Sequence, residues 1–286
     1  PLYSSAASDV YKRQSVDCGI NSVEEINFAN ELGLDFIITD HHEIIGDLPK
    51  AFAVINPKRE ENIYSYKYLA GVGTAFMLVY ALYSKLDRLN DLEKFLDIVA
   101  IGTVADIVPL TSDNRKFVKR GLKLLNNTKW IGIKQLLRKV FPEDWDTREY
   151  CSYDVGYLIA PIFNAAGRLE DAKQAVSLFI EEDGFECLTI IEQLLENNNE
   201  RKNIQKKILG NVNFLTLVIS VIVMIIGFLF SEKTLFLMGG RGTSLIHGGE
   251  YYRTILWGTP IWIYAIALNN LIRSEGKMKT AAAIMG

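Results

Sequence analysis

The chain has 286 residues and a formal net charge of −3, so it is long enough for one large domain or two ordinary ones. The weak negative charge argues against a protein that coats nucleic acid by bulk electrostatics, so any nucleic-acid contact would have to be a local groove. The three cysteines, Cys18, Cys151 and Cys187, have no CxxC spacing. This excludes a disulfide framework and indicates a reducing compartment.

Residues 1–14 have no hydrophobic periodicity, no initiator Met and none of the regions of a signal peptide. We interpret them as an artefactual leader and expect the authentic sequence to begin inside a strand at Ser15. The fold is therefore predicted from Ser15 onward.

A strand, a helix and a second strand follow. Residues 22–32 have helical apolar spacing, and Gly33 is placed to end the helix. Apolar runs before Asp17 and Asp40 predict the two strands, and residues 51–55 predict a third. Because a strand–helix–strand unit makes a right-handed crossover, the sequence predicts an α/β fold with a partial parallel sheet and flanking helices.

The apolar run at residues 36–39 ends abruptly in Asp40, His41 and His42. A buried strand that delivers polar groups at its carboxyl end is where α/β folds place chemistry. The alternative is that Asp40 caps a helix and the histidines begin a solvated loop. Asp17 also follows a strand, so two parallel strands would direct carboxylate and imidazole groups into one crevice.

From residue 69 the pattern is helical. Small residues at 70–73 would let the helix at 69–86 approach a sheet or a ligand, and we favour close packing because the spacing fits no phosphate-loop motif. Asp106 lies in apolar company near the end of a helix at 91–107, where it must be hydrogen-bonded or coordinate a cation. Shorter amphipathic helices are predicted at 112–125 and 131–140.

Asn164 and Arg168 flank three small residues that would let the backbone approach a phosphate or a carboxylate. The alternative is a plain turn at the end of a helix. Two further helices are predicted within residues 172–208, and the charges of the second are typical of a solvated face.

These segments, VDCGI, DHH, AGVG, GTVADIVPL and NAAGRL, occur in the order in which the RecJ family of the DHH phosphoesterase superfamily carries them. The resemblance covers residues 15–209. It implies a two-metal phosphodiesterase that uses Mn²⁺ or Mg²⁺ and removes nucleotides from single-stranded DNA in the 5′-to-3′ direction. Other DHH phosphoesterases hydrolyse small oligonucleotides, cyclic dinucleotides or pyrophosphate, but the NAAGR segment favours the RecJ family.

The resemblance also implies a role for each residue of the crevice. Asp17 would bridge the two metal ions, with His41 and Asp106 as further ligands. The adjacent His42 would face the scissile phosphate, and Asp40 would orient an imidazole. Carboxylates hold hard divalent cations, and an imidazole shifts the preference toward Mn²⁺.

Beyond the metals, Asn164 and Arg168 match the stretch that would help to hold the phosphate backbone. Residues 161–163 read Pro-Ile-Phe where the family commonly has Pro-Arg and an apolar residue. The family's first motif, Asp-x-Asp, and its DHH-associated C-terminal domain do not occur in this sequence. We therefore expect weak metal binding and little nuclease activity.

After Leu209 the composition changes. Residues 212–230 carry no charge and are long enough to cross a membrane as a helix, and residues 255–272 form a second apolar stretch. Buried helices of a soluble domain are the alternative, but we favour two membrane spans. Basic residues outside both spans would place both ends in the cytoplasm, with the loop at 231–254 facing outward.

This tail resembles the MATE family of antiporters, in the segments LMG, YY and NNLIRSEG, and would correspond to two of that family's helices. Two helices cannot build a transport cavity. We therefore expect a chimaera of three parts: a leader at 1–14, a truncated DHH domain at 15–209, cytoplasmic, and a two-helix membrane segment at 210–286. The alternative is a membrane-tethered protein whose degenerate DHH module binds a nucleotide.

Overall fold

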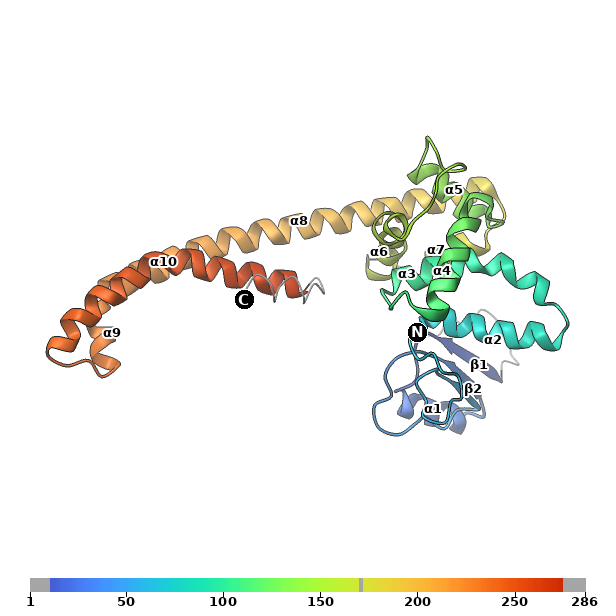
Figure 1. Cartoon of the computed structure of the whole chain (residues 1–286), viewed down its shortest axis with the longest axis horizontal. Coiled ribbons are helices and arrows are strands. Elements are labelled where there is room, and N and C mark those ends of the chain that lie inside the picture. The colour runs from blue at the N-terminus through green and yellow to red at the C-terminus, as the bar shows by residue number, and fades with distance from the viewer. Residues whose placement is uncertain (1–10, 170–171, 275–286) are drawn as a thin grey trace. The chain divides into compact units, whose positions relative to one another are not determined.

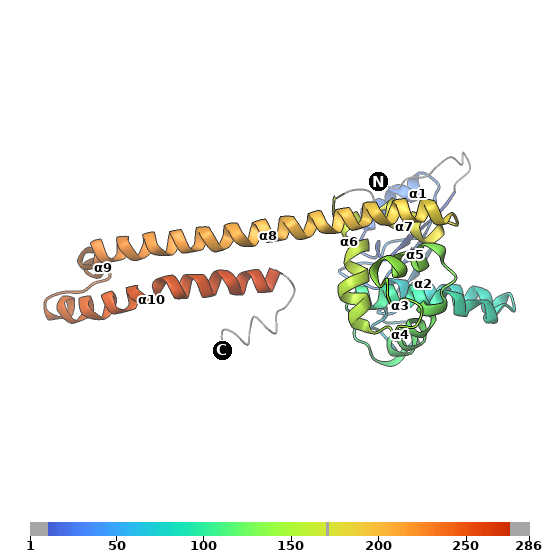
Figure 2. The same cartoon turned by 90° about the horizontal axis from the view of Figure 1, so that it is seen from above.

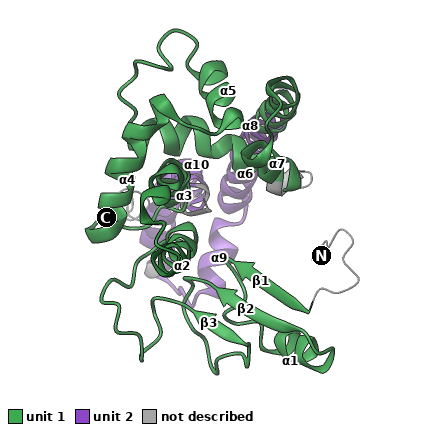
Figure 3. Cartoon of the chain, turned by 90° about the vertical axis from the view of Figure 1, so that its right-hand side faces the viewer, with its two compact units in different colours: residues 1–199 green, residues 200–286 purple. Residues whose placement is uncertain are grey.

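The computed structural model describes residues 11–169 and 172–274 (Figure 1). The chain forms two compact units, residues 1–199 and residues 200–286 (Figure 3). The division lies about ten residues before the predicted boundary at 209/210, and each unit is described separately below.

The first unit contains a three-stranded parallel sheet in the order β1-β2-β3. The strands are β1, Lys12–Val16, β2, Asp35–Thr39, and β3, Ala53–Ile55. The register sets the last residue of each strand opposite the last residue of its neighbour. The predicted parallel sheet is therefore confirmed. Strand β1 starts three residues before the predicted start at Ser15, because main-chain pairing with β2 requires no particular side chain.

Helix α1, Val23–Glu31, connects β1 to β2 and packs on the sheet (Figure 3). Its buried residues Ile26 and Ala29 contact Phe36 and Ile38 of β2 in one apolar cluster. Burial of these side chains stabilises the crossover by roughly 1.5–3 kcal/mol for each large residue. The crossover thus fixes the strand ends on which the candidate site is built.

The middle of the first unit is helical, as predicted. It contains α2, Gly71–Lys85, the 3₁₀-helix η1, Leu89–Phe95, α3, Leu96–Ala105, α4, Ser112–Leu124, the short 3₁₀-helix η2, Leu125–Asn127, and α5, Ile131–Val140. The predicted helix at 91–107 is thus divided between η1 and α3, and Asp106 is the residue that follows the last turn of α3. Helix α3 is the centre of this region because it contacts α2, α4 and α6.

A π-helix, η3, Asp154–Ile159, leads directly into α6, Ala160–Leu169, and α7, Lys173–Ile180, follows. Pro161 has no N–H and its ring would clash with the carbonyl one turn earlier in an α-helix. The wider π turn before it removes that conflict, and single π turns are frequent at functional sites. Asn164 lies within α6, and Arg168 lies in the last turn of this helix.

The close contact between α3 and α4 depends on Gly121. A Cβ atom built there would lie 2.0 Å from the Leu96 carbonyl oxygen and 2.5 Å from Ala100 Cβ. Gly121→Ala is expected to lower the free energy of unfolding of the first unit by about 3 kcal/mol, since backbone must move. Urea denaturation measures this. Gly210→Ala, in an open helical position, is the control and is expected to cause no loss.

Helix α8, Gly184–Leu229, contains 46 residues and crosses the predicted junction at 209/210 without a break. The sequence predicts a helix up to residue 208 that runs directly into the span at 212–230 without a linker, and the structure joins the two in one helix. A change from charged to apolar side chains alters the surface of a helix but supplies no residue that ends it. Gly210 is exposed within the helix and adopts helical geometry.

The second unit consists of the later part of α8, the short α9, Ser231–Leu237, and α10, Thr243–Ser274. Helix α10 runs beside α8 (Figures 1 and 2). A Cβ at Gly227 would lie 2.5 Å from Leu256 Cδ2, and the rings of Phe228 and Trp257 are 5.3 Å apart. A glycine thus permits close approach of the two helices, as is common in membrane helix pairs.

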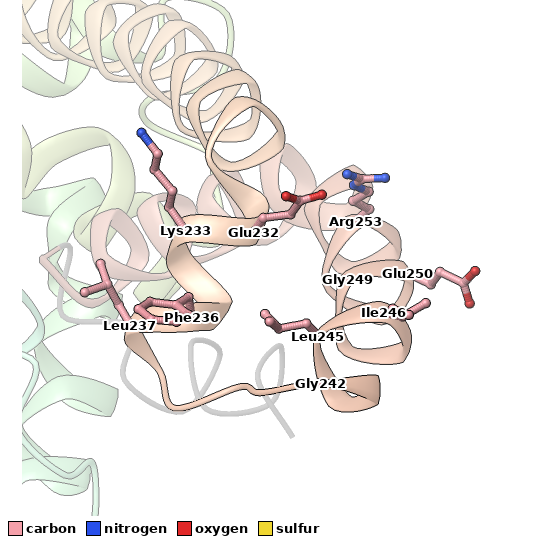
Figure 4. Close-up of a pocket in the computed structure, with 10 residues that line it drawn as sticks. All are labelled: Glu232, Lys233, Phe236, Leu237, Gly242, Leu245, Ile246, Gly249, Glu250 and Arg253. Carbon is pink, nitrogen blue, oxygen red and sulfur yellow. The ribbon is translucent and has the colours of Figure 1, made fainter.

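Among the described residues, one helix is long and apolar enough by composition to cross a membrane. It is α8, whose most apolar window has a mean hydropathy of 2.7 and is 6% buried. A hollow of about 850 Å³ lies between α9 and the start of α10 (Figure 4). Its lining is mainly apolar, with Phe236 and Leu237 from α9 and Leu245 and Ile246 from α10. The candidate metal site described below belongs to the first unit.

Candidate metal centre

The candidate site lies at the carboxyl edge of the parallel sheet. Asp17 follows β1, Asp40 follows β2 and Asn56 follows β3. Main-chain hydrogen bonds continue past the strands, from Asp17 N to the Thr39 oxygen at 2.9 Å and from Asp40 N to the Ile55 oxygen at 3.0 Å. The polar residues are therefore held by the same ladder that forms the sheet, which is the usual position of ligand sites in open α/β sheets.

Three predicted metal ligands converge here. His41 Nε2 lies 3.0 Å from Asp17 Oδ1 and 3.5 Å from Asp106 Oδ2. His41 is buried, whereas Asp17 is exposed and Asp106 is partly exposed. Asp17 has a φ of 64°, in the left-handed region, and this conformation sets the direction of its carboxylate. Residues that are far apart in the sequence thus meet at one point.

The arrangement fits a cation. His41 Nε2 is buried without a directed hydrogen bond, although two carboxylate oxygens lie close to it. The Asp17 carboxylate raises the pKa of His41, against the effect of burial. Burial raises the pKa of Asp106 most strongly; the charge of His41 opposes this by lowering the pKa, and the charge of Asp17 raises it. Two carboxylates and an imidazole nitrogen that face one another without a shared hydrogen bond would be stabilised by a divalent ion.

Asp40 has a different environment. Its side chain is 1% exposed, and its Oδ2 accepts the Ile20 N–H at 2.9 Å. Its Oδ1 accepts the His41 N–H at 2.7 Å and the His42 N–H at 3.2 Å, and it lies 2.7 Å from His42 Nδ1. Burial alone would raise the pKa of Asp40, but these hydrogen bonds outweigh it and hold the pKa below its ordinary value.

The contacts of Asp40 decide which residues could bind a metal. The possible ligand atoms of Asp17, Asp40, His41 and His42 all lie within 4.8 Å of one another. Both oxygens of Asp40 are already hydrogen-bonded, so this carboxylate is better placed to orient His42 than to coordinate an ion. Asp106, the residue that follows α3, is the better candidate for the second carboxylate ligand, because its Oδ2 approaches His41 Nε2.

Two asparagines, which the sequence interpretation did not single out, hold the histidine segment from either side. Asn56 is 1% exposed and donates from Nδ2 to the His42 carbonyl at 3.0 Å. Asn21 donates to the Glu43 carbonyl at 3.0 Å and accepts the Ile45 N–H at 2.9 Å. The turn after β2 is therefore pinned by neighbouring segments. The only signal in the sequence is an asparagine soon after each flanking strand.

A lysine also lies near the site. Lys58 Nζ pairs with Glu43 at 2.8 Å, and the Lys58 charge lowers the pKa of Asp106 within the opposing effects described above. The backbone N–H of Lys58 donates to Asn56 Oδ1 at 2.8 Å, so the asparagine that holds His42 also fixes the start of the lysine segment.

Among the described residues, no hydrogen bond or ion pair joins Asn164, one of the two predicted phosphate-binding residues, to this cluster. Asn164 is exposed on α6. Arg168 belongs to the same helix, but its side chain lies outside the described part of the chain. Helix α6 does contact α3, the helix that carries Asp106 at its end, so both residues are on an element next to the site.

Gly71, the first residue of α2, packs directly on Asp17. A Cβ there would lie 2.0 Å from Asp17 Oδ1, whereas a Cβ at Gly73 would lie 3.4 Å from the Leu69 side chain. Both glycines thus allow close packing, and the residue that Gly71 packs against, Asp17, is a candidate metal ligand. Gly71→Ala is expected to displace the Asp17 carboxylate and to lower the affinity for Mn²⁺ about 10-fold. Titration followed by electron paramagnetic resonance measures this, and Gly73→Ala is the control, with unchanged affinity expected.

Two parts of the sequence match known protein families. Residues 13–103 match the DHH family, N-terminal domain, and residues 197–286 match MatE. The first match contains both Asp17 and the Asp40–His42 segment, so the sheet edge lies within the part of the chain that is similar to the DHH family.

Among proteins of that family, the chain is similar to RecJ. It is 42% identical over 193 residues to the single-stranded-DNA-specific exonuclease RecJ of Bacillus subtilis, covering 68% of this chain and 24% of the relative. With RecJ of Escherichia coli it shares 37% identity over 203 residues, covering 67% and 35%. The chain thus spans about a quarter to a third of these relatives.

Solved structures agree. A crystal structure of RecJ from Thermus thermophilus in complex with Mn²⁺ superposes with a TM-score of 0.64 at 30% identity, over 71% of this chain and 30% of that one. The Mg²⁺ complex of RecJ from the same organism gives a TM-score of 0.57 at 28% identity, over 71% and 28%. The recognised resemblance to the RecJ family over the first part of the chain is confirmed, and so is the resemblance of the tail to the MATE family.

Proposed function

We propose that the first unit binds Mn²⁺ or Mg²⁺ and hydrolyses phosphodiester bonds of single-stranded DNA in the 5′-to-3′ direction. The observation that supports this is the convergence of Asp17 and Asp106 on His41 Nε2, at 3.0 and 3.5 Å, at the carboxyl edge of a parallel sheet. The similarity to relatives described as single-stranded-DNA-specific exonucleases supplies the substrate class.

Asp17 is proposed to bridge two ions, because its carboxylate is exposed and a carboxylate offers two oxygens. His41 and Asp106 are proposed as further ligands. When bound, the ions supply positive charge that stabilises the attacking and leaving oxygens of an in-line displacement. With Asp17, His41 and Asp106 as the proposed ligands, most coordination positions would be filled by water, so we expect weak metal binding and slow turnover.

His42 is proposed to face the scissile phosphate. An ionised carboxylate can only accept, so the contact with Asp40 places the hydrogen of the neutral imidazole on Nδ1. The Nε2 atom of this exposed ring then carries the lone pair, so it would accept a hydrogen bond or a proton from a group beside the scissile phosphate. Asp40 is proposed to fix this tautomer, and Asn164 and Arg168 to hold the phosphate backbone further along the strand.

The test is hydrolysis of a 5′-phosphorylated, 3′-labelled oligonucleotide by the detergent-purified full chain. We expect stepwise shortening from the 5′ end that requires Mn²⁺, stops with EDTA and is absent on a blunt duplex. His41→Ala should abolish it, and His247→Ala in the second unit is the matched control. The proposal would be contradicted if the wild-type chain did not bind Mn²⁺ and did not shorten the strand. A degenerate nucleotide-binding DHH module would instead bind mononucleotides without hydrolysing any strand.

A second function is favoured for the tail. We propose that residues 212–230 and 255–272 cross a membrane as a hairpin, with the first unit in the cytoplasm. The apolar, largely exposed part of α8 and the glycine-mediated contact of Gly227 with Leu256 support this. Alkaline carbonate extraction of expressing cells tests it: the chain should stay with the membranes and dissolve only in detergent. A chain found in the soluble fraction would contradict it, and no drug efflux is expected from two helices alone.

A further inference from the structure

Tyr157 of the π-helix η3 and Tyr153, the residue just before this helix, form an exposed aromatic pair. The rings of Tyr153 and Tyr157 are 4.9 Å apart with an angle of 26° between their planes, so they stack. Tyr153 is 60% exposed and Tyr157 is 68% exposed. An aromatic side chain that is buried can remove 150–250 Å² from water, so two stacked rings left at the surface are an unusual use of apolar area.

The pair is held in place from beneath. Asp154, the first residue of η3, is 3% exposed, accepts the Cys151 N–H at 2.9 Å and pairs with Arg148 at 2.8 Å. The neighbouring Val155 is fully buried. The helix turn that carries the tyrosines is therefore anchored by an ion pair and by the core, so the rings are presented on a rigid support and lose little freedom on binding.

The π-helix η3 contacts α3, the helix that ends just before the candidate ligand Asp106. Gly156, adjacent to Tyr157, packs on Val104, because a Cβ there would be 3.5 Å from Val104 Cγ1. Val104 is two residues before Asp106, and α3 and η3 are in contact along this side. Ile107, which follows the candidate ligand Asp106, is 89% exposed. Its φ of 58° is a conformation that a β-branched residue rarely adopts, and such conformations are frequent at functional sites.

We propose that Tyr153 and Tyr157 form a stacking platform for a base of the single-stranded nucleic acid whose backbone reaches Asp106. This rests on the proposed function and adds to it a base contact outside the metal ligands. Flat aromatic rings bind bases without regard to sequence, because every base has a π face. The chain's net charge of −3 leaves little bulk attraction for DNA, so a stacking contact would supply affinity that electrostatics does not.

The test is binding of a 3′-fluorescent, phosphorothioate-linked dT oligonucleotide to the full chain in detergent with Mn²⁺, measured by anisotropy. A series of strands carries one abasic site at successive positions from the 5′ end. We expect the wild-type chain to lose about 5- to 150-fold in affinity when one particular base is removed. The double variant Tyr153→Ala/Tyr157→Ala should bind the intact strand more weakly by a similar factor and should no longer distinguish it from the abasic strand.

Two matched variants separate stacking from a general loss of structure. Tyr157→Phe keeps the ring and should retain the affinity, and Tyr80→Ala removes a 44% exposed tyrosine from α2 and should change nothing. Mn²⁺ affinity should be equal in all variants. If the double variant keeps wild-type affinity and sensitivity to the abasic site, the platform is excluded while the nuclease proposal stands. If the wild-type chain binds Mn²⁺ but no single strand, the proposed substrate and the platform both fail.

Discussion

Replacing Asp106 with asparagine is expected to lower the affinity of the chain for Mn²⁺ by about 100-fold, because removing a ligand should cost at least as much as removing a group that only orients one. Asparagine has the same shape but no charge, and Asp106 Oδ2 lies 3.5 Å from His41 Nε2 in a cluster with Asp17. Isothermal titration with Mn²⁺ measures the change. Asp91→Asn, which removes an exposed carboxylate paired with Arg88, is the matched control and should leave the affinity unchanged.

The same substitution is expected to stabilise the metal-free chain near neutral pH. The pKa of Asp106 is raised in the folded state, first by burial and then by the charge of Asp17, so the ionised carboxylate is less stable there than in the unfolded chain. This penalty is absent at pH values below the unfolded pKa and is complete above the folded pKa. Asp106→Asn should therefore unfold at a higher urea concentration than the wild type at pH 7, with the difference vanishing in acid.

A substitution that weakens Mn²⁺ binding but stabilises the metal-free chain is characteristic of a residue in a binding site. Carboxylates that crowd one another in the absence of an ion reduce stability, and the ion reverses the effect when it binds. If Asp106→Asn bound Mn²⁺ as tightly as the wild type, Asp106 would not be a ligand, whatever happened to its stability. If it destabilised the metal-free chain at pH 7, the carboxylate would be satisfied by contacts within the protein.

The sheet edge could be predicted because the apolar residues of its strands and of the helix between them recur with a regular spacing. Apolar runs that stop at Asp17 and Asp40 with one helix between them must form parallel strands, and the ends of parallel strands meet. The contact of His41 with Asp106 was predicted differently, through the order of motifs shared with a known family. Spacing alone does not reveal that the end of α3 comes back to the end of β1.

The features that could not be predicted leave no periodic pattern in the sequence. The hydrogen bonds from Asn21 to Glu43 and from Asn56 to His42 join side-chain amides to main-chain carbonyls over irregular turns. The π-helix before Pro161 is another case, because the sequence pattern there is helical and does not show the wider turn.

Asp40→Asn is expected to destabilise the fold strongly. The Asp40 carboxylate is 1% exposed and accepts the N–H groups of Ile20, His41 and His42. An asparagine offers one oxygen and turns an NH₂ group toward a donor, so at least one buried N–H loses its acceptor. The free energy of unfolding should fall by about 3 kcal/mol, the upper part of the range for an unsatisfied buried group.

The pH dependence identifies the cause of that loss. Because the folded pKa of Asp40 lies below its unfolded value, its contribution to stability is complete above the unfolded pKa and is lost as the pH falls through the folded pKa. The gap in unfolding free energy between the wild type and Asp40→Asn should thus be widest near pH 7 and should narrow below about pH 4. Hydrogen exchange gives a local readout, because the Ile20 N–H bonded to Asp40 Oδ2 should lose protection in the variant. Asp35→Asn, at the start of β2, is the control for charge on the same strand, and an equal narrowing there would show that the effect belongs to net charge and not to the hydrogen bonds of Asp40.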